Sequence, residues 1–166
     1  MIIEWTLNHR PLRSEVSPFR RLIDHLREDL RLLGVKEGCR GGKCGSCTVW
    51  VDGRVANACL VLMGQMDGHE VVTIEGINEK DRFTPVQEAF LTSSAIECGF
   101  CTPGMIMSAT ELLDKNENPN RLEIREAMKG HLCACIGYER ILEAIEGVAI
   151  PPASEGSARM RVPRRT

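Results

Sequence analysis

The sequence predicts an α+β fold, in which a small β-sheet crossed by one helix is followed by a compact unit of four helices. Two observations favour this order: alternating apolar segments bounded by turn signals occupy the first half, and helix-start signals recur after residue 84. In addition, 43% of the 166 residues are apolar, enough to bury a core as one domain or two small ones. The predicted units are residues 1–76 and 84–148, followed by a basic C-terminal tail at 149–166.

The strands of the first half are predicted from alternation and flanking turns. They are expected at residues 2–8, 12–16, 47–51, and around 58–63 and 70–74. Asn8-His9-Arg10 is predicted as a turn that joins the first two strands in a hairpin, and Asp52-Gly53 is a tight-turn signal that predicts a second hairpin after the third strand. Between the second and third strands, Ser17-Pro18 begins a segment with apolar residues at helical spacing, and Gly34 is expected to end that helix. The first half is therefore a small sheet with one crossing helix.

The second half begins after a polar linker at residues 76–83. Its helices are predicted from start signals, two of which have the form of a capping box. The signals are Thr84-Pro85 with Gln87, Thr102-Pro103, Asn120 with Glu123, and a last helical segment from Gly137 to Glu146. A compact helical unit is expected.

Composition excludes some functions. The formal net charge is −2 and the isoelectric point is about 6.1, so no sustained basic face is available for nucleic acid. Only residues 155–166 are basic, and they predict a flexible or partner-ordered extension. No signal peptide and no apolar run of membrane-spanning length is found in the sequence. A cytoplasmic location without a transmembrane segment is expected.

The eight cysteines form two sets of four. In a reducing compartment they are more consistent with metal ligands than with disulfides. The first quartet is Cys39, Cys44, Cys47 and Cys59, and the second is Cys98, Cys101, Cys133 and Cys135. Two metal centres are therefore expected.

The spacing of the first quartet is that of a plant-type [2Fe–2S] ferredoxin, with four and then two residues between the first three cysteines. Glycines in this loop allow the backbone to wrap closely around an anionic cluster and to direct N–H groups at its sulfurs. These glycines are Gly38, Gly41, Gly42 and Gly45. A zinc site is the alternative, but zinc quartets are typically paired C-x2-C knuckles, and this spacing differs from that pattern.

The second quartet is less diagnostic by spacing. Cys101 directly precedes the helix start at Thr102, and Cys135 lies just before Gly137. Both pairs are therefore expected at helix N-termini. The positive end of the helix dipole lies there and favours an anionic cluster. By spacing alone, a zinc site or a redox-active C-x2-C dithiol stays open for this quartet.

Four stretches of the chain resemble one family. They are GCRGGKCGSCTVWVDG, ECGFCTPGMIMSA, NPNRLEIREAMKGHLCACIGY and the following ERILEAI. In this order they resemble the small iron–sulfur subunit, or N-terminal segment, of the molybdenum hydroxylases, the xanthine dehydrogenase and carbon monoxide dehydrogenase family. The resemblance extends over about residues 2–148.

The resemblance implies an N-terminal β-grasp domain of the plant-type ferredoxin kind and a four-helix domain, each holding one [2Fe–2S] cluster through its own cysteine quartet. It also implies a large partner subunit that holds molybdopterin and molybdenum, and usually a medium subunit that holds FAD. Electrons would leave molybdenum one at a time, passing through the helical-domain cluster and then the plant-type cluster to FAD or another acceptor. The resemblance also implies a hetero-oligomer, with a dimer of heterotrimers as one arrangement.

Some residues depart from the family pattern. Glu97 stands where Gln commonly contacts the pterin, and Ala134 and Ile136 replace the usual Arg and Thr around Cys135, whose counterpart typically bonds the pterin. His131 stands where Asn is common, and a surface role is expected for it. These changes leave every cysteine in place but affect the expected pterin contact and the cluster potential.

Electron relay is therefore the predicted function, with no substrate chemistry on this chain, since the sequence has no Ser/His/Asp constellation and no dinucleotide motif. A free-standing electron carrier with two clusters is the first alternative. A zinc-bound structural or assembly module is the second.

Overall fold

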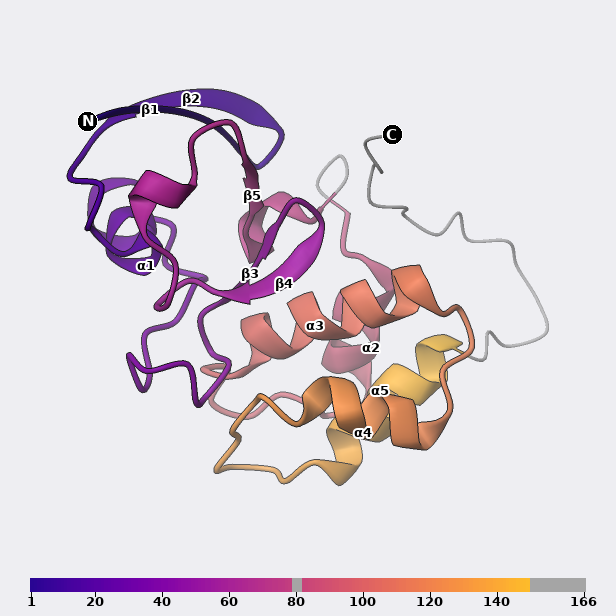
Figure 1. The fold of residues 1–166 in the computed structure, drawn as a ribbon. Helices are drawn as coiled ribbons and strands as arrows, with labels where there is room; N and C mark the ends of the chain where they lie inside the picture. Colours follow the sequence, from indigo (N-terminus) through magenta and orange to yellow (C-terminus); the bar gives the residue numbers. More distant parts are fainter. Residues whose placement is uncertain (79–81, 150–166) are drawn as a thin grey trace.

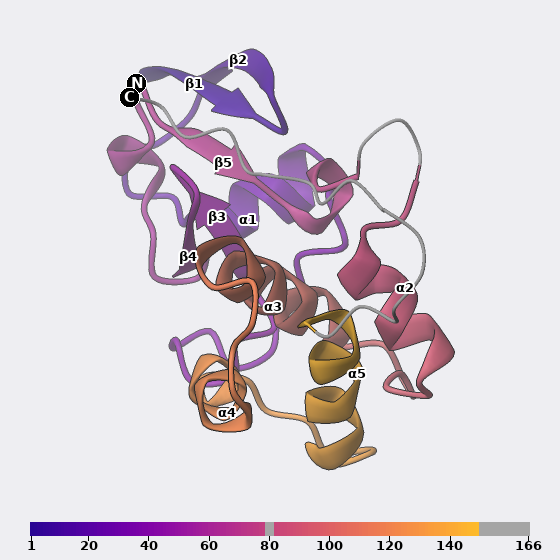
Figure 2. The same cartoon turned by 90° about the vertical axis from the view of Figure 1, so that its right-hand side faces the viewer.

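The computed structural model describes residues 1–78 and 82–149. It shows a mixed α/β fold, with a five-stranded sheet and five α-helices in the described ranges. Figure 1 and Figure 2 show the sheet with its short helix α1 in one part of the molecule and helices α2–α5 gathered in the other. Most of the predicted linker at 76–83 is described, whereas the predicted tail lies outside the described residues from residue 150 onward.

The sheet has the order β2-β1-β5-β3-β4. Its strands are β1 Ile2–Leu7, β2 Arg10–Glu15, β3 Thr48–Val51, β4 Arg54–Asn57 and β5 Glu70–Val72. The β1–β5 pair is parallel and the others are antiparallel. Both hairpin turns have residues with positive φ: Asn8 and His9 at 49° and 66°, and Asp52 and Gly53 at 49° and 75°. Such turns match the right-handed twist of the strands they join. Both predicted hairpins, β1–β2 and β3–β4, are therefore confirmed.

The predicted strand around residues 58–63 is wrong. The two-residue turn at 52–53 places Val51 opposite Arg54, so the fourth strand begins directly after the turn, at residue 54. The apolar run that follows does not pair in the sheet: Ala58 is fully buried, Leu62 forms an isolated bridge with Arg21, and a 3-10 turn spans Met63–Gln65. Ala58, Cys59 and Met63 are buried in this segment, whereas Leu60 is exposed. Periodicity cannot distinguish such a short apolar run from a buried strand.

The crossing helix is shorter than predicted. Helix α1 spans Leu22–Asp24 and continues as a π-helical turn at His25–Asp29, and Arg31 has φ 58°, so the helical segment ends before Gly34. Three apolar side chains of this segment are almost fully buried against the sheet: Leu22, Ile23 and Leu26.

The helices after residue 84 are α2 Pro85–Thr92, α3 Thr102–Lys115, α4 Arg121–Met128 and α5 Glu139–Ala149. Both predicted capping boxes are confirmed. Thr84 accepts from the N–H of Gln87, and Asn120 accepts from the N–H of Glu123, with reciprocal side-chain bonds. These bonds satisfy N–H groups that have no partner inside the helix.

Two apolar cores lie side by side. One joins the sheet to α1, and the other fills the space among α2–α5 but also includes Trp50 of β3 and Val72 of β5. Trp50 Nε1 donates to the carbonyl of Met107 on α3 over 3.0 Å, and both groups are buried. Sheet and helices are thus joined by apolar packing and a buried hydrogen bond.

Within the ranges that the structure describes, no helix is long and apolar enough to cross a membrane.

Candidate metal centres

The first cysteine loop, residues 38–47, connects the helical segment at 22–29 to β3. Cys39 is exposed at its start, whereas Cys47 and Cys59 are buried against the sheet. The backbone N–H groups of Gly41 and Lys43 point at Cys39 Sγ, at 3.4 and 3.2 Å. These two bonds lower the pKa of Cys39 to about 6, chiefly the one from Gly41. The loop therefore favours a thiolate, the form that binds metal.

Glycine is required at specific points of this loop. Gly42 and Gly45 have φ of 71° and 68°, a region that side chains disfavour. A Cβ at Gly38 would lie 2.8 Å from Cys44 Sγ, so only glycine leaves room beside that sulfur. Gly41 is different, because a Cβ there would meet its nearest atom at 3.8 Å. Its contribution is the N–H group that it directs at Cys39.

The four sulfurs of this quartet associate in pairs. The Cys39 thiol interacts with Cys44, and the Cys47 thiol interacts with Cys59. Burial, together with its neighbour Cys59, raises the pKa of the Cys47 thiol to about 12. A buried thiol of this kind is inert unless a cation such as iron stabilises its thiolate.

The second quartet also associates in pairs, although its members are far apart in the sequence. Cys135 Sγ lies 3.5 Å from Cys98 Sγ. Cys101 interacts with Cys133, and burial raises the pKa of Cys101 to about 12. The outer pair, Cys98 and Cys135, is exposed, whereas the inner pair is partly buried.

One expectation about this quartet is wrong. Cys101 is the N-cap residue of α3, as predicted, but α5 begins only at Glu139, after Gly137 with φ 72°. Cys133 and Cys135 therefore lie in the loop before α5 and not at a helix N-terminus. The turn at Gly137 separates them from α5, whereas the sequence predicted that the helix begins at Gly137 itself.

Paired cysteines fit a binuclear cluster. In a [2Fe–2S] cluster four cysteines are shared between two irons, two for each. A tetrahedral zinc site instead needs its ligands to converge on one ion. The pairwise association of the sulfurs in both quartets fits the donor arrangement of a two-iron cluster.

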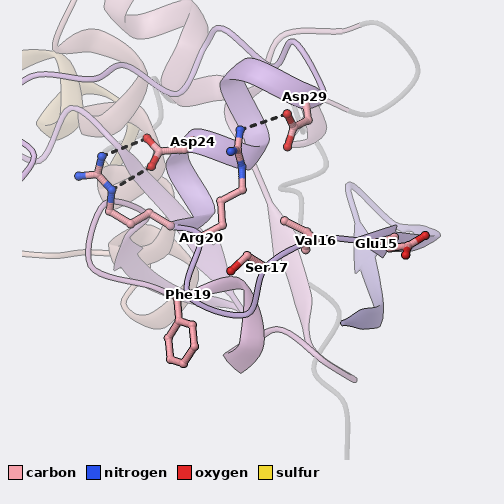
Figure 3. A pocket seen from close by; sticks show the side chains of 8 residues that line it. Glu15, Val16, Ser17, Phe19, Arg20, Asp24 and Asp29 are labelled. Atoms are coloured by element: carbon pink, nitrogen blue, oxygen red, sulfur yellow. Dashed lines mark hydrogen bonds and ion pairs between the residues drawn. The ribbon is translucent and has the colours of Figure 1, made fainter.

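A surface hollow of about 570 Å³ lies elsewhere, between the end of β2 and the helical segment at 22–29 (Figure 3). Four of its charged side chains form two ion pairs. Arg20 donates to Asp29 over 3.1 Å, and Arg21 donates to Asp24 over 2.9 Å. None of the cysteines lines this hollow.

Comparison with known proteins also indicates two [2Fe–2S] binding domains. Residues 11–87 match a family described as a 2Fe-2S iron-sulfur cluster binding domain, and residues 73–146 match one described as a [2Fe-2S] binding domain. The nicotine 6-hydroxylase small subunit of Paenarthrobacter nicotinovorans is 44% identical over 86% of each chain. The xanthine dehydrogenase iron-sulfur-binding subunit of Escherichia coli O157:H7 is 43% identical over 86% of this chain and 91% of that one.

The chain belongs to the small iron–sulfur subunits of the molybdenum hydroxylases. Two solved structures agree with this assignment. In the structure of quinoline 2-oxidoreductase from Pseudomonas putida 86, one chain matches with a TM-score of 0.86 and 42% identity, over 90% of this chain and 92% of that one. The aldehyde oxidoreductase of Desulfovibrio desulfuricans matches with a TM-score of 0.85 and 40% identity, over 89% of this chain but only 17% of the longer one.

The two cysteine regions of this iron–sulfur subunit contact each other directly. The N–H of Leu132 donates to the carbonyl of Cys44 over 3.0 Å. The first turn of α3 also approaches the first loop so closely that a Cβ at Gly104 would overlap the carbonyl oxygen of Gly45. Figure 1 shows the loop after α1 beside the segment that follows α4. Sequence reasoning missed this contact, because residues 44 and 132 are too distant in the chain for any local pattern to connect them.

The structure also corrects the prediction for His131. Its side chain is buried, only 4% exposed, although a surface role was expected. Burial lowers the pKa of His131 to about 4. Glu97, by contrast, is exposed beside the exposed Cys98, where a partner protein could reach both.

Proposed function

We propose that each cysteine pair holds one iron of a [2Fe–2S] cluster. Cys39, Cys44, Cys47 and Cys59 would hold the first cluster, and Cys98, Cys101, Cys133 and Cys135 the second. The observation that carries this assignment is the two-by-two association of the sulfurs in both quartets. A bound [2Fe–2S] cluster supplies a group that accepts and releases one electron. The chain is thus the electron-transfer subunit of a molybdenum-containing oxidoreductase.

The proposed domains follow the sequence prediction. Residues 1–76 would form a β-grasp domain of the plant-type ferredoxin kind, and residues 84–148 a four-helix domain. The sheet order β2-β1-β5-β3-β4 with one crossing helix supports the first assignment. The separate apolar core among α2–α5 supports the second. Trp50 and Val72 link the two cores, so the domains hold the two sites in a fixed relative position.

The exposed cysteines indicate where partners would meet the chain. At the second site the exposed pair, Cys98 and Cys135, lies beside Glu97 and would face a large subunit that holds molybdopterin and molybdenum. At the first site Cys39 is exposed and would face a medium subunit that holds FAD. The chain's own residues bury Cys47 and Cys59, partly cover Cys101 and Cys133, and connect the two loops through the bond from Leu132 to Cys44.

The names of the relatives support an assembly of several chains. One is named as the small subunit of a nicotine hydroxylase and another as a subunit of a xanthine dehydrogenase. We propose a hetero-oligomer with the two partner subunits above, in the cytoplasm, with a dimer of heterotrimers as one arrangement. The alternative is a free-standing carrier with two clusters, for which a stable monomer on its own would be expected.

Electron paramagnetic resonance of the dithionite-reduced chain, with iron counted on the same sample, tests this assignment. Two distinguishable signals and about four irons per chain are expected, the number that two two-iron clusters require. Cys59→Ser should remove the signal of the first cluster only, and Cys133→Ser that of the second only. Each variant is the control for the other, because each replaces one less exposed cysteine of one quartet.

Loss of the same signal in both variants would contradict the two-site assignment. A colourless, iron-free chain purified without oxygen would contradict the iron–sulfur assignment as a whole. Co-purification of the wild-type chain with larger subunits would separate the subunit from the free-standing carrier.

A further inference from the structure

The segment before Cys133 is where the two cysteine regions touch. Leu132 donates its N–H to the carbonyl of Cys44, which ties the second region to a proposed ligand of the first cluster. Leu132 cannot fix this contact by its own packing, because its side chain is 58% exposed. Gly130 has no side chain to pack, and only its carbonyl oxygen approaches the first loop, since a Cβ at Gly45 would lie 2.5 Å from it. The side chain that can hold this bond in position is therefore that of the remaining residue, His131.

His131 is the one buried residue between Gly130 and Cys133, and its ring connects three elements. Nε2 lies 2.7 Å from the hydroxyl of Ser108 on α3. The opposite edge of the ring lies against the first cysteine loop, since a Cβ at Gly45 would overlap Nδ1. The imidazole thus lies between α3 and the loop that carries Cys44.

The backbone of His131 is fixed as well. Its N–H donates to the carbonyl of Met128 over 3.0 Å, at the end of α4. Its carbonyl accepts from the hydroxyl of Tyr138 over 2.7 Å. Side chain and backbone together hold the residue in one orientation, and the peptide that follows it presents the Leu132 N–H to Cys44. A buried, fully packed side chain of this kind tolerates little change in volume.

We propose that His131 is a positioning residue that fixes the contact between the two cysteine regions and thereby sets how fast electrons cross between them. This inference rests on the ligand assignment proposed above. The ring of His131 contacts Ser108 and lies against Gly45, so it acts on the two cysteine regions through the Leu132–Cys44 bond. Groups that exchange electrons need a fixed separation, which a rigid supporting contact provides.

A second buried histidine provides a matched control. His25 is 5% exposed, close to the 4% of His131, and its Nε2 also contacts a serine hydroxyl, that of Ser14 at 3.0 Å. It lies in the sheet half, against Trp5, and its side-chain partners are Ser14 and Asp29. Loss of either imidazole removes a buried ring and a serine contact, and His25→Ala also removes the contact of Nδ1 with Asp29 Oδ2 at 2.6 Å. If only the loss of buried structure mattered, His25→Ala would therefore have at least as large an effect as His131→Ala.

The experiment compares the full chain carrying both clusters with variants at these positions. His131→Ala removes the ring, Ser108→Ala removes only its hydroxyl partner, and His131→Gln places an amide nitrogen near the position of Nε2. His25→Ala is the control. For each, iron content, the resonance signal of each reduced cluster, the magnetic interaction between the two reduced clusters and the rate of electron transfer between them are measured.

We expect His131→Ala and Ser108→Ala to retain both signals but to lose the wild-type magnetic interaction and to slow the transfer between clusters. His131→Gln should restore part of the magnetic interaction and of the transfer rate, and His25→Ala should leave these two quantities unchanged. Unchanged interaction and rate in Ser108→Ala or in an iron-replete His131→Ala would overturn the inference, as would the same change in His25→Ala. A wild-type chain with fewer than two clusters would instead overturn the ligand assignment, and the inference with it.

Discussion

Gly104→Ala tests how closely α3 packs on the first cysteine loop. A Cβ at residue 104 would overlap the carbonyl oxygen of Gly45 and lie 3.2 Å from its carbonyl carbon and 3.3 Å from Cα of Ser46. These are backbone atoms, so no rotation of a side chain relieves the overlap. Either the loop or the first turn of α3 must move, which would also disturb the contact between the cysteine regions.

The size of the effect follows from two opposing contributions. Forcing extra volume into a packed site costs about 1–3 kcal/mol. Alanine in place of glycine in a helix returns at most about 1 kcal/mol. With the middle of the cost range, about 2 kcal/mol, and the full gain of about 1 kcal/mol, we expect Gly104→Ala to lower the free energy of unfolding by about 1 kcal/mol. For a chain of this size each kcal/mol shifts the melting temperature by about 2–4 °C, so a decrease of about that size is expected.

Thermal unfolding under anaerobic conditions, followed by circular dichroism and by the visible absorbance of the clusters, measures this shift. Gly147→Ala on α5 is the control, because a Cβ there would have no atom within 4 Å. The control should melt at the wild-type temperature or slightly above it, since only the helix-propensity gain applies. If Gly104→Ala melted at or above the wild-type temperature, the close approach of α3 to the loop would be refuted.

Three further predictions concern single side chains. Asn120→Ala removes the cap of α4 and should lower the free energy of unfolding by about 1 kcal/mol, measured as a lower melting temperature. Trp50→Phe removes the hydrogen bond to the Met107 carbonyl and should cost about 1 kcal/mol in the same assay, before any loss from the smaller ring. An unchanged melting temperature in either variant would contradict the stated contact. Glu97→Gln removes a negative charge next to Cys98, so the reduction potential of the second cluster should rise. A potentiometric titration followed by electron paramagnetic resonance measures this potential, and a lower value than in the wild type would contradict the prediction.

Much of the fold was predictable because its signals are local. Both hairpin turns and both capping boxes arise from a few adjacent residues, and the structure has them where the sequence placed them. The strand predicted around 58–63 was wrong because an apolar run is equally consistent with a buried crossing segment. The expected helix start next to Cys135 was wrong because the turn at Gly137 delays α5 until Glu139.

The sequence by itself determined the chemistry of this protein. Cysteine number and spacing, with glycines that allow a tight loop, predict two iron–sulfur sites, because thiolate ligands and backbone freedom are properties of the residues themselves. Only the tertiary structure decided which cysteines pair, since Cys98 and Cys135 are 37 residues apart in the chain. It also decided that His131 is buried between the two regions and that Leu132 bonds to Cys44. These contacts depend on how α3 packs against the sheet, and packing between distant segments leaves no periodic signal in the sequence.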